Sequence, residues 1–427
     1  MDHILGEHGA SLWEHKILPL RQQAATRMGW LRKRLDTILP EIMRREGFDA
    51  WIVSGREYNE DPVLMTLLPP TTSISARRRT ILLFFLKPDG SVERLSLSRT
   101  GSGHDELYQG VWDQFKEEQW ECVARLVRER DPKCIGINVS KTFAFGDGLT
   151  HAEHGELMRA LGDDLATRTR GAERLAVGWL ERRSKDELDA YPGIVQMVHG
   201  IVAEAFSAAV VHPGVTTSLD VTWWIRQRME AQGLPAWFHP SVSAQRRGKQ
   251  DLGPGEVIRP GDVLHCDVGF HYLGLATDCQ QLAYVLRPGE NDAPAGLKAA
   301  LKAGNDLQDI LAAEMQLGRT GNQILAESLA KMKAAGIDGS IYTHPLGNHG
   351  HGAGPTIGLF DHQEGVPGRG DYELFADTCH AMELCAKKPV PEWGGQVVTA
   401  ALEEDIWFDG ERVRFLDGRQ TAFHLIR

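Results

Sequence analysis

Four acidic residues and one histidine in the C-terminal part of the chain lie in apolar or glycine-rich settings. They are Asp267 in HCDVGF, Asp278 in ATDCQQ, His351 in GHGAG, Glu383 in HAMELC and Glu403 in ALEEDIWF. Burying such carboxylates together is unfavourable unless a positive charge lies among them. Two divalent metal ions would supply that charge. The set therefore predicts a metal-dependent hydrolase.

The size and composition of the chain indicate how many domains it forms, which partners it binds and where it is located. Its 427 residues exceed one ordinary hydrophobic core, so we expect two domains, and 42% hydrophobic with 25% charged residues is typical of a globular protein. A net charge of -11 argues against nucleic acid or an anionic membrane as the main partner. We find no signal peptide, no membrane-spanning stretch and no CxxC pairing among the six cysteines, and expect a cytoplasmic protein.

Helical and strand patterns alternate over the first ~170 residues, as in α/β domains. Residues 31–47 have helical spacing, with Gly47 closing the helix and a kink or break expected at Pro40. RTILLFFL and SVERLSLS predict a β-hairpin. Further elements are expected as strands at 50–54 and 134–139 and helices near 112–130 and 153–162. We place this α/β domain at residues 1–178.

A second domain is expected over residues 179–427. Ser184 and Glu187 have the spacing of a capping box and predict the start of a long amphipathic helix. Thr217 or Ser218 would begin the next helix. Beyond residue 235 the chain is rich in strand patterns, with a helical block at about 293–335. This mixture predicts an α+β domain.

Asp267 and Asp278 each lie in a run of alternating character. Side chains on a strand repeat on one face at every second residue, so the two aspartates can face each other across adjacent strands and hold two ions. Taken alone, each is as readily explained as a turn or edge residue. Cys266 and Cys279 should point to the opposite face and act as small core residues.

Residues 343–365, THPLGNHGHGAGPTIGLFDHQEG, contain four histidines among glycines. These are His344, His349, His351 and His362. A lone histidine is usually structural, but four in so short a glycine-rich segment favour a site. We expect one to bind metal and the others to carry protons or to stabilise an oxyanion.

Glu383 and Glu403 both lie in strand-like apolar segments, where a solvated glutamate is out of place. Cys385 falls on the same face as Glu383 and can line the site. Glu404 and Asp405 are expected to lie outside the ligand set or in solvent.

Taken in order, the five residues resemble the ligand set of the M24-type pita-bread metallopeptidases, which include methionine aminopeptidases, prolidases and Xaa-Pro aminopeptidases. The spacing of the two aspartates, the GHGxG context of His351 and the segment around Glu403 all agree. The start of a creatinase/prolidase-type N-terminal domain is resembled by the segment RKRLDTILPEIMRREGFDAWIV. The first helix of the catalytic domain is resembled by the segment ERRSKDELDAYPGIVQMVHGIVAEA. The resemblance implies an α/β N-terminal domain followed by an α+β pita-bread domain.

The resemblance also implies roles for these residues. Asp267 would chelate one metal ion, Asp278 and Glu403 would bridge two, and His351 and Glu383 would complete the second. The ions would be Mn²⁺, with Co²⁺, Fe²⁺ or Zn²⁺ also compatible with these donors. His362 matches a histidine on the substrate side, His344 or His349 would fill the other histidine role, and His349 is the rival ligand. The substrate would be a short peptide or peptide-like molecule, and the assembly a homodimer.

Three positions depart from the family pattern. AQRRGKQDLG has no histidine where the family places one about seventeen residues before Asp267, and His239 is the nearest substitute. Ala401 replaces an arginine, and Leu384-Cys385 replaces Pro-Gly. These changes leave two functions open: cleavage of Xaa-Pro peptides, or a non-peptidase activity of the same fold, as a small-molecule amide hydrolase or a lyase.

Two hypotheses that place the protein in another functional class have weaker support. The first is an amidohydrolase barrel, because His349-Gly350-His351 matches the HxH motif of those enzymes, but there the motif lies early in the chain. The second is a metal-free binding module, and bound metal in the purified protein would argue against it.

Overall fold

The computed structural model describes residues 13–249 and 252–427. The chain divides into two compact units, Pro19–Ser184 and a second that joins the segment ending at Leu18 to Lys185–Arg427. The boundary expected at residues 178/179 lies within helix α5 (Glu173–Glu181). The first ~30 residues of the sequence predict a helical lead-in. Positions 1–12 lie outside the described residues, and the first α-helix begins at Leu20.

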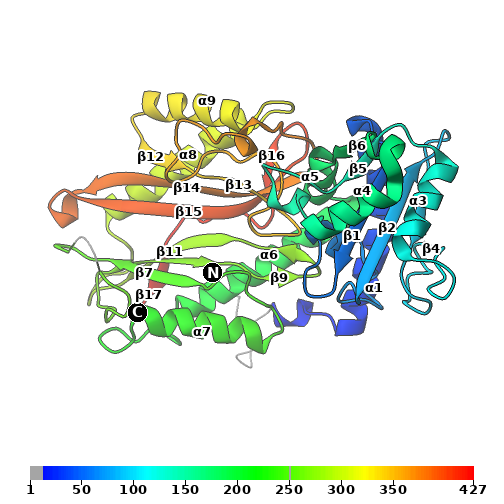
Figure 1. The fold of residues 1–427 in the computed structure, drawn as a ribbon. Coiled ribbons are helices and arrows are strands. Elements are labelled where there is room, and N and C mark those ends of the chain that lie inside the picture. Colours follow the sequence, from blue (N-terminus) through cyan, green and yellow to red (C-terminus); the bar gives the residue numbers. More distant parts are fainter. Residues whose placement is uncertain (1–12, 250–251) are drawn as a thin grey trace. The chain divides into compact units, whose positions relative to one another are not determined.

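The unit Pro19–Ser184 is built on a six-stranded sheet of order β4-β3-β2-β1-β5-β6 (Figure 1). The expected hairpin is present as β2 and β3, paired antiparallel, whereas β1 pairs parallel with β5. The strands are β1 (Ala50–Arg56), β2 (Arg79–Leu86), β3 (Val92–Ser96), β4 (Gln109–Gly110), β5 (Ile135–Ile137) and β6 (Thr169–Gly171). The helices are α1 (Leu20–Glu46), α2 (Pro62–Leu67), α3 (Gln119–Arg130), α4 (His151–Ala166) and α5.

Of the kink or break expected at Pro40, the structure shows no break, because helix α1 continues through the proline. The helix ends at Gly47, whose φ of 70° is the left-handed conformation that glycine adopts easily. Leu39 and Met43 on either side of the proline are fully buried. Their packing outweighs the backbone hydrogen bond that proline removes.

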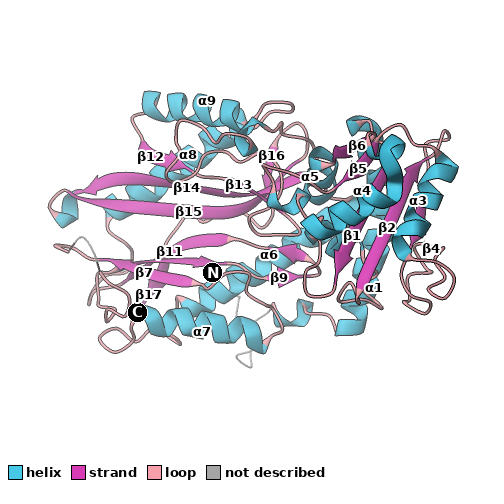
Figure 2. Cartoon of the chain, in the orientation of Figure 1, coloured by secondary structure: helices cyan, strands magenta, loops and turns pink. Residues whose placement is uncertain are grey.

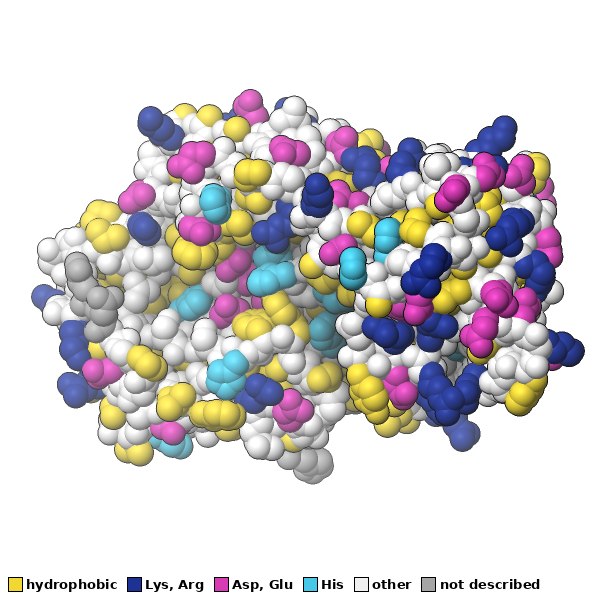
Figure 3. Space-filling view, viewed as in Figure 1, with side chains coloured by type: hydrophobic (Ala, Val, Ile, Leu, Met, Phe, Trp, Pro, Cys, Tyr) yellow, Lys and Arg dark blue, Asp and Glu magenta, His cyan; other side chains and the backbone are white. Residues whose placement is uncertain are grey.

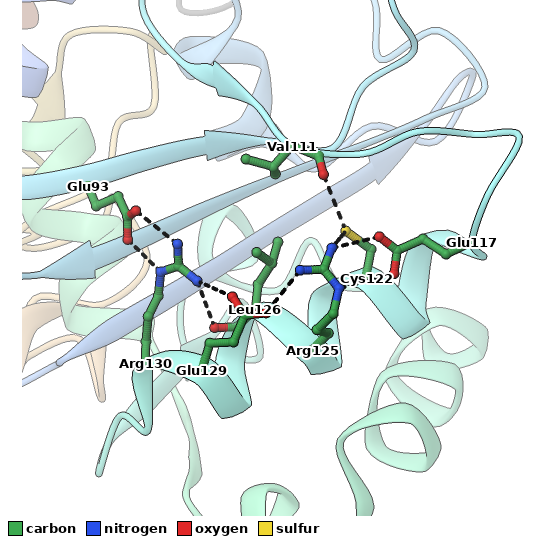
Figure 4. A network of polar contacts seen from close by, with 8 residues as sticks. All are labelled: Glu93, Val111, Glu117, Cys122, Arg125, Leu126, Glu129 and Arg130. Atoms are coloured by element: carbon green, nitrogen blue, oxygen red, sulfur yellow. Dashed lines mark hydrogen bonds and ion pairs between the residues drawn. The ribbon is translucent and has the colours of Figure 1, made fainter.

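Arginines anchor α3 to the surrounding chain. Arg130 forms a two-pronged ion pair with Glu93 of β3, and Arg125 binds Glu117 and Glu129 (Figure 4). The paired geometry fixes the end of the helix against the sheet, although partly exposed pairs contribute only about 0–1 kcal/mol each.

The unit that contains Lys185–Arg427 is built on one sheet whose main path is β12-β14-β15-β11-β8-β7, with β13, β16 and β17 paired at its sides (Figure 2). Its long strands are β14 (Thr378–Val390) and β15 (Gln396–Phe408). The other strands are β7 (Ser241–Gln245), β8 (Val263–Val268), β11 (Cys279–Val285), β12 (Asp338–Ile341), β13 (His344–Leu346), β16 (Val413–Phe415) and β17 (His424–Ile426), with β9 (His271–Tyr272) and β10 (Leu275–Ala276) forming a separate ribbon.

Within the described part of this unit, four helices cover the sheet. They are α6 (Lys185–Ala205), α7 (Ser218–Ala231), α8 (Ala295–Glu314) and α9 (Gly321–Ala334). Helix α8 packs on β14 and β15, α9 on β12, α6 on β11, and α7 on β7 (Figure 1). Helix α7 begins where Thr217 or Ser218 was expected to start it: Thr217 is its N-cap and forms a capping box with Asp220.

Strand β15 shows how the helices divide the sheet into two faces. Leu402 belongs to a hydrophobic cluster with Leu297 and Leu301 of α8, and Ile406 to one with Leu307 and Leu311. Residues at odd positions of the strand point the other way. The core beneath α8 therefore leaves the opposite face of β15 free to carry polar side chains.

Among the described residues, no helix combines the length and the hydropathy that crossing a membrane requires.

Candidate metal centre

Strand register brings three of the predicted acidic residues into one row. Asp267 on β8 lies opposite Gln280 on β11, Gln280 lies opposite Glu403 on β15, and Glu403 lies opposite Glu383 on β14. All four side chains therefore share the face that the helices do not cover. In Figure 3, acidic and histidine side chains gather in a hollow over these strands.

Asp278 joins this row from the position just before β11. It lies two residues before Gln280 and so shares its face, as the sequence predicted for the two aspartates. Its backbone N–H donates to both carboxylate oxygens of Asp405, at 3.2 and 3.3 Å. This contact fixes the entry of β11 and orients Asp278 toward Glu403.

The histidine that lies among the carboxylates is His344. Its Nε2 lies 3.3 Å from Glu403 Oε1 and 3.4 Å from Asp278 Oδ2. The register explains this position, because His344 on β13 pairs with Ala381 of β14, two residues before Glu383 and thus on the same face. Asp278, His344 and Glu403 bring one possible metal-binding atom each to within 4.8 Å of one another.

His351, the histidine expected to bind metal, lies on the outer side of His344. The two rings meet edge to face, with centroids 4.7 Å apart and planes at 90°. On its other side His351 meets the ring of Trp237, with centroids 5.0 Å apart. His351 is exposed. The structure therefore places it between the carboxylates and solvent, in contact with the ring of His344.

The other candidate histidines lie farther out. His362 has a side chain 55% exposed at a turn closed by pairing of Leu359 with His362, and its ion-pair contact among the described residues is with Asp361 at 4.0 Å. His349 is half-buried in the loop before His351, and its carbonyl accepts a hydrogen bond from Gly347. His239 lies against Trp223, with ring centroids 5.0 Å apart.

Burial and mutual repulsion shift the pKa values of the cluster. Burial is the main cause that raises the pKa values of Asp267, Asp278, Glu383 and Glu403, and neighbouring carboxylates add to it for Asp267, Asp278 and Glu403. Burial alone would lower the pKa of His344, but its close contact with Glu403 and the surrounding negative charge outweigh burial and raise the pKa to about 9. The cluster therefore attracts cations, whether protons or metal ions.

The opposite shift applies to His351. Although the residue is exposed at its outer side, partial burial of its ring lowers the pKa to about 4, and the positive charges of His344 and Arg369 add to the effect. No sequence pattern indicated that Arg369, which lies in a short 3-10 helix (Arg369–Asp371), belongs near this histidine.

The donor atoms of the cluster fit a metal ion. Asp267 Oδ1, Asp278 Oδ1, Glu403 Oε1 and His344 Nε2 are buried, and none has a hydrogen-bond partner among the described residues. Unpaired buried polar atoms are costly unless a ligand satisfies them. Carboxylate oxygens with one imidazole suit Mn²⁺, Fe²⁺, Co²⁺ or Zn²⁺.

The opposite face of the same strands carries a polar network around His199 of α6. His199 lies 2.9 Å from both Glu404 and Asp417. Cys266 and Cys279, predicted to be small core residues, are buried. Glu404 and Asp405 are also buried, so of the two positions predicted for them, outside the ligand set or in solvent, the one in solvent is wrong.

Comparison with known proteins agrees with this geometry. Residues 194–406, from α6 to β15, match the family model "Metallopeptidase family M24". The chain belongs to this family. The predicted resemblance to the M24 metallopeptidases and the predicted enzyme class, a metallopeptidase, are thereby confirmed. A comparison with curated protein sequences found no significant match.

Solved structures extend the M24 likeness over almost the whole chain. An X-Pro aminopeptidase from Thermotoga maritima MSB8 has 14% identity and a TM-score of 0.64, over 90% of this chain and 99% of that one. An Xaa-Pro dipeptidase from Bacillus anthracis has 15% identity and a TM-score of 0.62, over 95% and 100%. The predicted fold class, an N-terminal domain followed by a pita-bread domain, is confirmed.

The same fold also occurs in a protein whose name describes no peptidase. The N-terminal domain of the FACT complex subunit SPT16 from Cicer arietinum has 11% identity and a TM-score of 0.55, over 94% of this chain and 99% of that one. The substrate of this M24 protein must therefore be argued from its own side chains.

Proposed function

We propose that this M24 protein is a metal-dependent peptidase that cleaves short peptides at an Xaa-Pro bond. The observation that carries the proposal is the convergence of buried carboxylates on His344, with several donor atoms that lack hydrogen-bond partners among the described residues. The names of similar structures, X-Pro aminopeptidase and Xaa-Pro dipeptidase, support the choice of substrate.

In this proposal the metal ligands are Asp267, Asp278, His344, Glu383 and Glu403, with His344 taking the place first expected for His351. Mn²⁺ is the first candidate ion. When bound, divalent ions supply the Lewis acidity that activates water and polarises a scissile carbonyl. His351 is the proton carrier, because its exposed ring stands over the cluster in contact with His344.

Arg369 provides a recognition site for the substrate. It is exposed, its charge acts on His351, and no carboxylate forms an ion pair with its guanidinium among the described residues. A guanidinium binds a carboxylate through two parallel hydrogen bonds. We therefore propose that Arg369 binds the free C-terminal carboxylate of the substrate, a role compatible with the absence of arginine at Ala401.

A peptide panel tests this function. Purified protein supplied with Mn²⁺ should cleave an Xaa-Pro dipeptide faster than its C-terminal amide. Arg369→Ala should raise KM for the dipeptide by about 10-fold or more, the value of one charged hydrogen-bonded contact, and leave the amide unchanged. Arg412→Ala, which changes an exposed arginine of the turn before β16, is the matched control. Inactivity on every peptide with metal bound contradicts the proposal.

The same panel addresses the alternative function. Small zwitterionic compounds included beside the peptides test a lyase or amide hydrolase of the same fold. Assembly as a homodimer and a cytoplasmic location stay predictions. Light scattering of the purified protein at several concentrations measures the first of them.

A further inference from the structure

Gln280 lies in the middle of the row of carboxylates. It is 3% exposed and stands opposite Asp267 on one side and Glu403 on the other. Its side-chain nitrogen donates hydrogen bonds to Glu403 Oε2, at 2.9 Å, and to Glu383 Oε1. An amide nitrogen has two N–H groups, so both are used by the two glutamates.

A histidine holds the amide in this orientation. His265, two residues before Asp267 on β8, has its Nε2 2.8 Å from Gln280 Oε1. Because the amide oxygen can only accept, His265 donates from Nε2, and its Nδ1 is left facing Ser243 Oγ at 3.5 Å. Rotating the amide would place its oxygen against two carboxylates and its nitrogen against a donor. Gln280 is therefore fixed as a donor to the glutamates.

These contacts divide the cluster into two unequal parts. Glu403 turns Oε2 toward Gln280, whereas Oε1 faces His344 and Asp278. That second side offers three donor atoms from three residues. Among the described residues, the other group of three candidate metal-binding side chains is His199, Cys279 and Glu404, on the helix-covered face.

We propose that Gln280 competes with a second metal ion for Glu383 and Glu403. The inference rests on the proposed metal-dependent function. The first ion binds at Asp278, His344 and Glu403, which the amide leaves free. A second ion on the side of Asp267 and Glu383 must displace hydrogen bonds from a donor that His265 keeps in place, so it binds more weakly.

A calorimetric titration of the metal-free protein with Mn²⁺ alone tests the inference. The wild-type protein should take one equivalent with a Kd at least 10-fold below that of the second. Gln280→Ala removes the donor and should bring the two dissociation constants to within about threefold. A spectroscopic signal of coupled Mn²⁺ pairs should then appear at two equivalents of metal in the variant and only at higher Mn²⁺ in the wild type.

Two further variants complete the design. Gln281→Ala removes the neighbouring buried glutamine on the opposite face, where it contacts His424, and should behave as the wild type. Gln280→Met keeps the volume if the alanine variant fails to fold. Two equally strong sites in the wild type, or unchanged unequal sites without the Gln280 donor, overturn the inference. Absence of any Mn²⁺ binding would instead refute the proposed function.

Discussion

The rings of His344 and His351 meet edge to face, 4.7 Å between centroids, and only His344 reaches the carboxylates. In the proposed function, His344 therefore binds metal while His351 acts on the substrate. The two histidines are separated by only seven positions in a glycine-rich segment. Their contrasting positions give the first prediction.

Replacing each histidine by alanine should separate metal binding from catalysis. His344→Ala should weaken Mn²⁺ binding by more than about 100-fold, the upper range for loss of a ligand's supporting hydrogen bond. His351→Ala should bind Mn²⁺ normally and lose kcat by about 10²–10⁴-fold, the contribution of a general acid–base group. Calorimetry and steady-state kinetics measure the two effects. Loss of Mn²⁺ binding in His351→Ala, with normal binding in His344→Ala, would instead identify His351 as the ligand.

Removing metal should destabilise the protein. The buried carboxylates repel one another, so a cation that binds only the folded state shifts the unfolding equilibrium, by about 2.7 kcal/mol at 100 times its Kd. Dialysis against a chelator should lower Tm, and Mn²⁺ should restore it. Mg²⁺ at equal concentration is the control, because a site with an imidazole donor favours Mn²⁺. An identical Tm with and without Mn²⁺ would count against a metal centre.

Stability should fall in alkaline solution because of His199. Burial works against its charged form, but hydrogen bonds to Asp417 and Glu404 outweigh burial and raise its pKa to about 10. The folded state thus holds a proton that the unfolded state has lost, and stability present below about pH 6.5 declines toward pH 10, by up to about 1.4 kcal/mol per pH unit.

Urea unfolding at pH 7 and pH 9 measures this decline. His199→Gln should be less stable at pH 7 and should show a flatter pH dependence. His212→Gln, a change at an exposed histidine of the same unit, should keep the wild-type slope. Equal slopes in wild type and His199→Gln would show that other groups release the proton.

Gly350 should tolerate no larger residue. A Cβ at this position would lie 2.1 Å from the ring of Trp237, which is held by a hydrogen bond from its Nε1 to the carbonyl of Thr277 at 2.9 Å. We expect Gly350→Ala to cost about 1–3 kcal/mol and to displace the adjacent His351, lowering kcat. Trp237→Ala in the same chain should recover part of the stability. Thermal unfolding and kinetics of the single and double variants test this coupling.

Much of the fold follows from local sequence patterns. Three local features agree with prediction: the start of α7 after Thr217, the hairpin of β2 and β3, and the end of α1 at Gly47. Each depends on residues that lie close together in the chain. Of the kink or break predicted at Pro40, the break is absent, because buried neighbours hold α1 together. Local propensity is decisive only where packing does not oppose it.

The carboxylates of the site could also be chosen from the sequence. Asp267, Asp278, Glu383 and Glu403 stood out because acidic residues in apolar strands are costly without a cation. Strand alternation then indicated which neighbours share their face. The same alternation places Gln280 on that face, but its role depends on contacts with two strands that lie more than a hundred residues farther along the chain.

By itself, the sequence determined the chemistry of this protein: the carboxylates, their settings and the alternation that turns them to one side of a sheet. Only the tertiary structure decided which histidine joins them. Four histidines of similar local character compete within one glycine-rich segment, and the choice depends on the register in which β13 pairs with β14. Register is set by packing over the whole sheet, and a shift of one residue turns every side chain to the other face.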